Sequence, residues 1–355
     1  MSDNKQKLHK ILDYSIDKKA SDIHLSAERR PVLRIDGKLE KIRKWEKLRK
    51  QEAKNIALSL MNDGQKDKFL KEKEIDFSYT HNGKHRFRVN AYFRMEKVSL
   101  AMRRIPLKIK SLEQLNLPVS LYDFSAEKQG LVLVTGPASH GKSTTLAALI
   151  DKIDQERFEH IVTIEDPIEY VFKGRNSLID QREIGQDTYS FSKALKSVFR
   201  QDPDVIMVGE MRDPETIETA ITAAETGHLV FSTLHTNSAT QTINRIVDTF
   251  PGGQQGQIRA QLSTSLLGVI SQRLIPRRTG GLVPACEVLK KNSAVSNLIR
   301  EGKVHELDTV VETSSNEGMF SLNKYLVNLV QANEITPENA LAFSPKPKSL
   351  QKRIN

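Results

Sequence analysis

The sequence is poor in cysteine and contains no long apolar run. Cys286 is the only cysteine, so the chain can form neither an intrachain disulfide nor a cysteine-rich zinc site, and a lone cysteine is most often a small buried apolar residue. No stretch approaches the roughly 18 apolar residues of a membrane-spanning helix, and the first residues lack the apolar core of a signal peptide. The sequence therefore predicts a protein that stays in the cytosol.

Charge is unbalanced, with a net value of +10 over 355 residues, of which 38% are hydrophobic. The segment from Lys38 to Lys54 carries eight basic residues against three acidic ones, and Pro345 to Asn355 carries four basic residues and no acid. Either stretch could contact nucleic acid, anionic lipid or an acidic protein, or could simply be solvated surface. Because prolines interrupt the last stretch, residues 343–355 are predicted to be a disordered basic tail.

The pattern of apolar residues changes along the chain. Residues 74–104 alternate in the manner of strands, with Asn82-Gly83 as a hairpin turn, and a short amphipathic helix precedes them at residues 8–16. From Gly130 onward, buried strands alternate with helices, which indicates a parallel α/β sheet. We therefore predict a small α+β domain over residues 1–105, a linker over 106–115 and an α/β domain over 116–342.

One motif dominates the α/β domain. An apolar strand ending at Thr135 leads into a glycine-bracketed loop and then a helix, in the pattern G-x4-G-K-[ST]. Such a loop offers backbone N–H groups to phosphate oxygens, a lysine reaches the β- and γ-phosphates, and the serine hydroxyl binds Mg²⁺. The predicted ATP-binding residues are Gly136, Pro137, Ala138, Ser139, His140, Gly141, Lys142, Ser143 and Thr144.

Two further apolar strands end in acidic residues. One leads to Glu165-Asp166-Pro167-Ile168-Glu169 and the other to Gly209-Glu210. In a parallel sheet, ligands collect at the carboxyl ends of the strands, so both acidic clusters are expected to face the phosphate loop. Hydrolysis of ATP needs a held metal and an oriented water, and carboxylates suit both tasks. Glu169 and Glu210 are therefore the predicted catalytic and metal-associated acids, although each could instead be a turn or surface charge.

Two histidines, His228 and His235, lie at either end of another apolar strand. Seven residues apart on a strand, they are too far from each other to share a metal easily. Spacing alone favours packed or hydrogen-bonded histidines over catalytic ones.

The phosphate loop, the Thr163–Tyr170 segment, the Asp202–Asp213 segment and the Thr226–Thr236 segment together resemble, in order and spacing, the four signature boxes of secretion and type IV pilus ATPases. The resemblance extends to Ala20–Leu25, Arg86–Asn90 and Ser293–Arg300, and so covers most of the chain. Within that superfamily the sequence is most similar to the PilT-type retraction, or twitching-motility, ATPases.

That resemblance implies a ring hexamer in which a PAS-like N-terminal domain precedes a RecA-like P-loop motor domain, with ATP held between the two. It implies that Lys142 and Ser143 bind phosphate and Mg²⁺, that Glu169 lies in the Asp box, and that Glu210 ends the Walker B strand. His228 and His235 become the His-box residues. Arg88, Arg103 and Arg104 become candidates to approach the γ-phosphate, also from a neighbouring subunit.

The resemblance further implies a platform protein of the inner membrane at the pilus base as partner, with the motor peripherally associated there. Other pilus ATPases are a second class of partner, and nucleic acid is not expected. Which of the two glutamates polarises the water and which holds the metal's water shell stays open.

Two departures from the family pattern stand out. The loop carries Ala138-Ser139-His140 where many members have Thr-Gly-Ser, and because these positions contribute mainly backbone, nucleotide binding should survive. The retraction motif, usually Ala-Ile-Arg-Asn-Leu-Ile, here has Ser296 in place of the arginine, which puts the motif's usual role in question.

Four rival functions stay open at this stage. A pilus-assembly or type II secretion ATPase would typically carry a four-cysteine zinc module, which a chain with one cysteine cannot form. An accessory retraction ATPase shares the same motifs. A nucleotide-sensing scaffold would need no water-activating carboxylate, and a DNA-dependent motor is suggested only by the basic charge.

Overall fold

A computed structural model describes residues 3–35, 37–106 and 108–354 of the chain. Met1, Ser2, Asp36, Leu107 and Asn355, which fall within the predicted domains, linker and tail, lie outside the described residues. The chain divides into two units, one of residues 1–108 and 167–171 and one of residues 109–166 and 172–355. Along the chain, the short segment Pro167–Val171 has residues of the second unit on both sides, yet it belongs to the first unit. The domain ranges predicted from the sequence place this segment in the α/β domain.

The first unit is a six-stranded antiparallel sheet with helices. Its elements are α1 (Asp3–Asp17), β1 (Asp22–Ser26), β2 (Val32–Ile35), β3 (Lys38–Lys41), α2 (Lys50–Ser59), α3 (Asp63–Glu72), β4 (Glu74–His81), β5 (His85–Arg94) and β6 (Lys97–Arg104). The strand order is β3-β2-β1-β6-β5-β4. Alternate residues of β5, from Phe87 to Ala91, are fully buried, so the period-two pattern in the sequence does mark one apolar face of the sheet. The predicted Asn82-Gly83 turn joins β4 to β5, with both residues at positive φ.

The second unit is built on a seven-stranded sheet. Its strands are β7 (Gly130–Thr135), β8 (His160–Glu165), β9 (Leu178–Glu183), β10 (Val205–Val208), β11 (Leu229–Leu234), β12 (Leu266–Pro276) and β13 (Leu282–Lys290). The order is β13-β12-β7-β11-β10-β8-β9, and all neighbouring pairs are parallel except β12 with β13. Strands β7, β10 and β11 are buried along their whole length, which explains their unbroken apolar runs.

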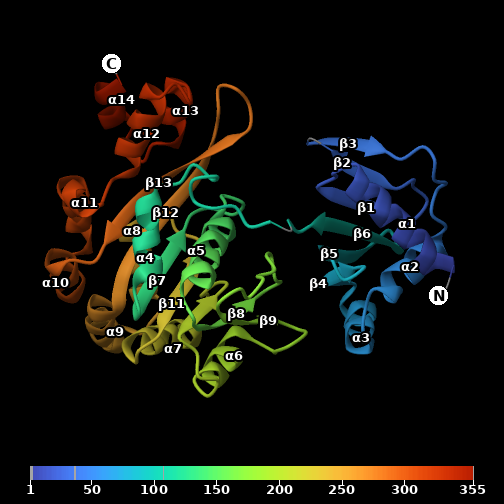
Figure 1. Cartoon of the computed structure of the whole chain (residues 1–355), viewed down its shortest axis with the longest axis horizontal. Coiled ribbons are helices and arrows are strands. Elements are labelled where there is room, and N and C mark those ends of the chain that lie inside the picture. Colours follow the sequence, from blue (N-terminus) through green and yellow to red (C-terminus); the bar gives the residue numbers. More distant parts are fainter. Residues whose placement is uncertain (1–2, 36, 107, 355) are drawn as a thin grey trace. The chain divides into compact units, whose positions relative to one another are not determined.

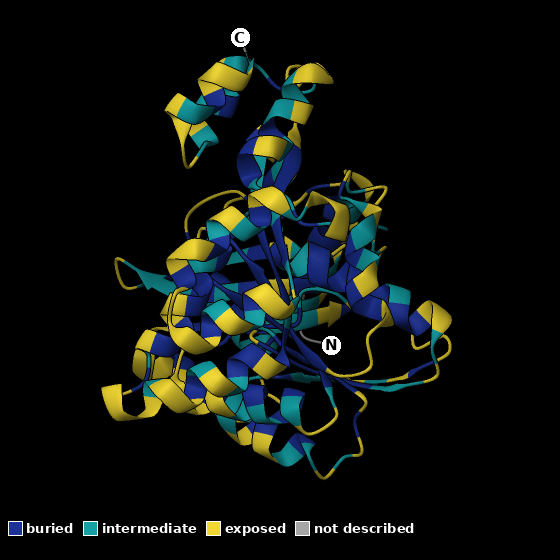
Figure 2. Ribbon diagram, turned by 90° about the vertical axis from the view of Figure 1, so that its left-hand side faces the viewer, coloured by how far each residue is buried: buried dark blue, intermediate teal, exposed yellow. Residues whose placement is uncertain are grey.

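Helices cover this sheet and extend the unit. They are η1 (Val119–Tyr122), α4 (Asp123–Ala126), α5 (Lys142–Glu156), α6 (Phe191–Val198), α7 (Pro214–Glu225), α8 (Ala239–Asp248), α9 (Gly252–Ser265), α10 (Ser293–Glu301), η2 (Val304–Glu306), α11 (Leu307–Thr313), η3 (Ser315–Glu317), α12 (Leu322–Gln331), α13 (Pro337–Phe343) and α14 (Pro347–Ile354). Figure 1 shows α12, α13 and α14 gathered at one end of the unit. Buried residues concentrate on the strands and on the inward faces of the helices (Figure 2). The predicted fold class, an α/β P-loop domain preceded by a small α+β domain, is confirmed.

The prediction of a disordered tail is wrong. Residues 347–354 form α14, in which Leu350 is fully buried against an apolar cluster that includes Ile275 and Leu326. The Lys346 ammonium also pairs with Asp308 at 3.1 Å. In the sequence, residues 347–354 are mostly polar, because Leu350 and Ile354 are the only large apolar residues among them. These two residues lie four positions apart on one face of the helix, and the apolar surface that they cover exists only once α12 and α13 are folded.

Candidate functional site

The phosphate loop joins β7 to α5 as the sequence predicts. Gly141 has φ of 82° and precedes the first residue of α5, while Gly136 has φ of 144°. A Cβ at Gly136 would lie 2.3 Å from the backbone oxygen of Gln272, so no larger residue fits there. The loop therefore owes its course both to its glycines and to the strand against which it packs, β12.

Lys142 opens helix α5 and is almost completely buried. Its ammonium donates hydrogen bonds to the carbonyl oxygens of Gly136 and Pro137, each at 2.9 Å. Ser143 and Thr144 follow in the first helical turn, where backbone N–H groups have no partner within the helix. A cation, the backbone N–H groups of a first helical turn and the positive end of a helix dipole thus converge at one point, which is an arrangement suited to a polyphosphate.

Glu210 and His235 lie together at the same edge of the sheet. Glu210 follows β10 and His235 follows the adjacent strand β11, and the His235 Nε2 atom is 3.6 Å from a carboxylate oxygen of Glu210. The other carboxylate oxygen accepts from the guanidinium Nε of Arg212 at 2.7 Å. The Thr233 hydroxyl donates to the carbonyl of Gly209 at 2.7 Å and fixes the turn that carries the glutamate.

The surroundings of His235 favour its neutral form. Burial and the positive charge of Lys142 lower the pKa of His235, while Glu210 acts in the opposite direction. The influence of Lys142 also shows that the phosphate loop and the Glu210–His235 pair form one electrostatic environment. A neutral imidazole beside a carboxylate can accept or donate a hydrogen bond at this edge without adding a charge.

The acidic segment after β8 is divided between the two units. Glu165 is buried at the end of β8, where it accepts hydrogen bonds from the Thr163 hydroxyl at 2.7 Å and the Gln181 amide at 3.1 Å. Glu169 belongs to the first unit, where one of its carboxylate oxygens lies 3.6 Å from the Arg88 guanidinium. The sequence treated the segment as one cluster facing the phosphate loop, whereas the structure assigns its last glutamate to the arginine-bearing sheet.

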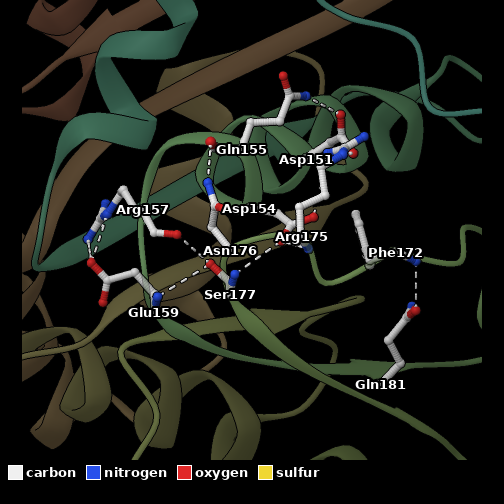
Figure 3. Close-up of polar contacts among 10 residues, drawn as sticks. All are labelled: Asp151, Asp154, Gln155, Arg157, Glu159, Phe172, Arg175, Asn176, Ser177 and Gln181. Atoms are coloured by element: carbon white, nitrogen blue, oxygen red, sulfur yellow. Dashed lines mark hydrogen bonds and ion pairs between the residues drawn. The ribbon is translucent and has the colours of Figure 1, made fainter.

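The chain that follows this segment is tied to the helix of the phosphate loop (Figure 3). The Arg175 guanidinium pairs with Asp151 at 3.0 Å, and the Arg175 backbone N–H donates to the buried carboxylate of Asp154 at 2.7 Å. Asn176 donates to the carbonyl of Gln155 at 2.6 Å. Helix α5 therefore begins at the phosphate loop, and its other end binds Arg175 and Asn176, which follow the segment that contains Glu169.

The side chains of the three candidate arginines lie on opposite faces of the sheet of the first unit. Arg88 on β5 and Arg103 on β6 are partners in register and therefore share one face of the sheet. The Arg103 Nε donates to Asp22 at 2.8 Å, and although burial acts to raise the pKa of Asp22, hydrogen bonds from Arg103 and Ser21 lower it overall. Arg104 projects to the opposite face, where it donates to the carbonyl of Ile16 near the end of α1. The structure thus groups Arg88 with Arg103 and gives Arg104 a hydrogen bond to α1 instead.

His228 is not brought to the site. It immediately precedes β11 and lies at the amino edge of the sheet, where its Nδ1 is 3.0 Å from the carbonyl of Ala223 and its ring packs edge-on against Phe199. The six residues of β11 separate it from His235, so the two histidines are seven residue steps apart, about 23 Å at roughly 3.3 Å per residue. A catalytic role for His228 at the phosphate loop of its own chain is therefore wrong, because strand length holds it away.

Sequence reasoning missed two residues of the site. Gln272 on β12 contacts the phosphate loop, and Arg212 pairs with Glu210. The available signal for Gln272 was the polar stretch Ser271-Gln272-Arg273 between the apolar residues of β12, since a polar residue buried in a strand needs a hydrogen-bonding partner.

The described residues contain no group of three or more histidine, cysteine, aspartate or glutamate side chains that could hold a metal ion. Among the same residues, no helix is both long and apolar enough to cross a membrane.

Comparison with known proteins gives consistent findings. Residues 3–341 match the family described as type II/IV secretion system protein. The chain is 45% identical to the type IV pilus retraction ATPase PilT of Pseudomonas aeruginosa over 93% of this chain and 96% of that protein. It is 47% identical to the twitching motility protein of Neisseria gonorrhoeae over 87% of this chain and 83% of that one. The crystal structure of the pilus retraction motor PilT with bound ADP superimposes with a TM-score of 0.91 at 46% identity, covering 97% of this chain and 98% of the other.

Proposed function

Because the chain belongs to the type IV pilus retraction ATPases of the type II/IV secretion system family, we propose that it works as a hexameric, Mg²⁺-dependent motor whose ATP hydrolysis drives pilus retraction. The observation that carries the chemical part is the convergence of Lys142, Glu210 and His235 at the carboxyl edge of the sheet. This is the arrangement that phosphoryl transfer to water requires, namely a cation for the phosphates and a carboxylate for the water.

The residues fit a magnesium ion held mainly by its substrate. Mg²⁺ binds few protein oxygens and takes most of its ligands from phosphates and water. Ser143 would offer its hydroxyl to the ion, and Glu210 would orient a water molecule bound to the ion. The ion would neutralise charge on the β- and γ-phosphates.

Lys142 supplies the charge nearest the loop. Its ammonium already caps loop carbonyls and needs only to reorient to meet a phosphate oxygen. Glu210, held in place by Arg212, would accept a hydrogen bond from the attacking water, and His235 would stand beside it. Glu169, the other predicted catalytic acid, pairs with Arg88 in the first unit; which glutamate polarises the water is tested below.

In the proposed hexamer, the face that carries Arg88 and Arg103 contacts the neighbouring subunit. Their side chains are partly to largely exposed and lie on neighbouring strands, so one face of the first unit presents two guanidinium groups. In a ring, such a face could meet the γ-phosphate of a neighbouring copy and stabilise charge in the transition state.

The proposed partners are a platform protein of the inner membrane at the pilus base and other pilus ATPases, with peripheral attachment to that membrane. Retraction is favoured over assembly because the single cysteine, Cys286, is buried and the chain cannot form a four-cysteine zinc module. The departure at Ser296 lies on α10 beside Val295, which packs into the core, so the motif keeps its helix and lacks only the arginine's charge.

The test is Mg²⁺-dependent ATP hydrolysis by the purified protein over a range of concentrations, with size-exclusion light scattering on the same samples. Turnover should rise as a hexamer forms and vanish in Lys142→Ala, because the site then lacks its phosphate cation. A monomer that binds ATP and never hydrolyses it would indicate a nucleotide-sensing scaffold. Stimulation by DNA, without stimulation by pilus-base components, would indicate a DNA-dependent motor.

A further inference from the structure

Strand β12 is longer than the strand beside it. Its last residue in register with β7 is Ser271, opposite Thr135, yet β12 continues to Pro276. Past Thr135 the neighbouring chain turns into the phosphate loop. The backbone groups on this side of β12 therefore face the loop instead of another strand, and they need partners from it.

The loop provides those partners through His140. The backbone N–H of Leu274 donates to the His140 Nδ1 atom at 2.8 Å, and the Gln272 side-chain amide donates to the His140 carbonyl at 2.9 Å. One loop residue thus holds β12 at two points, once by its side chain and once by its backbone.

Gln272 connects the same point to helix α5. It is 2% exposed, and its side-chain oxygen accepts from the Thr145 hydroxyl at 2.6 Å while its nitrogen holds the loop. A Cβ at Gly141 would lie 2.9 Å from that nitrogen, which places the amide directly against the loop's second glycine. Both ends of this amide are therefore used, one on the loop and one on the first turn of the helix.

The loop needs such support because part of it is in an unfavourable conformation. Ser139 has φ of 64°, a left-handed conformation that glycine adopts easily and serine does not. A strained loop keeps one conformation only when its surroundings determine it. Burial, Arg273 and Lys142 lower the pKa of His140, which keeps its ring neutral and able to accept from Leu274.

We propose that His140 and Gln272 are positioning residues that clamp the phosphate loop onto β12 and hold its N–H groups ready for the diphosphate of the nucleotide. The inference deepens the proposed function, on which it rests for the identity of the nucleotide. The clamp acts through the loop and needs no contact with the phosphates themselves. Its loss should weaken nucleotide binding much more than it slows turnover at saturation.

The experiment is a fluorescence titration of the full-length protein with an N-methylanthraniloyl derivative of ADP. Gln272→Met keeps the length of the side chain but removes both hydrogen bonds, and His140→Ala removes the acceptor for Leu274. Each variant should raise the Kd roughly tenfold, the usual effect of losing a buried hydrogen bond. His140→Asn should bind within about twofold of the unaltered protein, because its side-chain oxygen can take the place of Nδ1.

Gln261→Met is the matched control. Gln261 donates to Glu225 at 2.7 Å, at the amino edge of the sheet and away from the loop, so the same substitution there should leave the Kd unchanged. Melting temperatures without nucleotide are measured for every variant. A residue with only a structural role would lower the melting temperature without changing the Kd and would not be rescued by asparagine.

The clamp is refuted if Gln272→Met binds as tightly as Gln261→Met and His140→Ala binds as tightly as His140→Asn. If Gln272→Met does not fold, the comparison of alanine with asparagine at position 140 decides alone. For ATP, the KM should rise more than kcat falls. If the unaltered protein binds ADP but does not hydrolyse ATP, the proposed motor function is refuted. The comparison of Kd values among the variants would still test the proposed role of His140 and Gln272.

Discussion

Glu210 is the residue whose surroundings are most specific to chemistry. Arg212 holds one of its carboxylate oxygens and His235 lies beside the other, and the strand before it is completely buried. A surface carboxylate would not need such support. The residue is therefore both fixed in position and kept partly accessible at the edge of the sheet.

We expect Glu210→Gln to bind ATP as the unaltered protein does and to lose hydrolysis by roughly a hundredfold or more, because the amide cannot accept a proton or orient water as a carboxylate does. Binding is measured by nucleotide titration and turnover by phosphate release. Glu218→Gln, an exposed change on α7, serves as the control and should keep full turnover. Unchanged turnover in Glu210→Gln would remove this residue from the mechanism.

Glu169 requires its own substitution because the structure pairs it with Arg88. If Glu169→Gln loses turnover as completely as Glu210→Gln does, both carboxylates act on the reaction. If it mainly raises the KM for ATP, Glu169 acts on binding and not on the attacking water.

At the scale of elements, Glu287 joins the sheet to two helices. The carboxylate on β13 accepts from the backbone N–H of Ala239 at 2.9 Å, at the start of α8, and also from the backbone of Leu322, at the start of α12. One side chain thus caps two helix N-termini. Helix α8 begins shortly after His235, so this cap also supports the edge of the sheet that carries the site.

The pKa of Glu287 predicts a pH dependence of stability. Burial raises this pKa above its ordinary value, Asp308 acts in the same direction, and the two backbone hydrogen bonds and Lys346 act against it. The folded protein then binds a proton here more tightly than the unfolded chain. The stabilisation from this group is therefore complete below the ordinary pKa of glutamate and is lost as the pH rises through the folded value.

We expect Glu287→Gln, which cannot ionise, to gain stability relative to the unaltered protein as the pH rises from about 5 to about 8. Chemical denaturation across that range measures the difference in free energy of unfolding. Glu312→Gln, an exposed change on α11, is the control and should show no trend. A difference that stays constant with pH would show that Glu287 titrates as an ordinary glutamate.

At the scale of the whole molecule, the chain consists of two units with separate cores. The core of the first unit includes Leu8, Phe69 and Phe87, all fully buried within residues 1–108. A six-stranded sheet with helices and its own core has what independent folding requires.

We expect a fragment of residues 1–106 to fold alone, with a cooperative thermal transition by circular dichroism and dispersed amide resonances. It should not bind nucleotide, since the phosphate loop lies in the other unit. A fragment without a cooperative transition would show that the first unit needs the second for its stability.

Part of this architecture was predictable from the chain alone. The phosphate loop is a continuous stretch of sequence in which each residue type has its own task, and the burial of β7, β10 and β11 follows from their apolar runs. The position of Glu210 at the carboxyl edge of the sheet could be predicted because the carboxyl ends of parallel strands always meet at one edge.

Other features depend on which residues the fold brings side by side. The pairing of Glu169 with Arg88, the position of His228 at the far edge and the helix at residues 347–354 each involve partners distant in sequence. The clamp of Gln272 on the phosphate loop spans 132 residues. The sequence by itself therefore determined the chemistry of the nucleotide site, because that chemistry is written in a contiguous motif. Only the tertiary structure decided which side chains support it, because a hydrogen bond depends on position in space and not on separation along the chain.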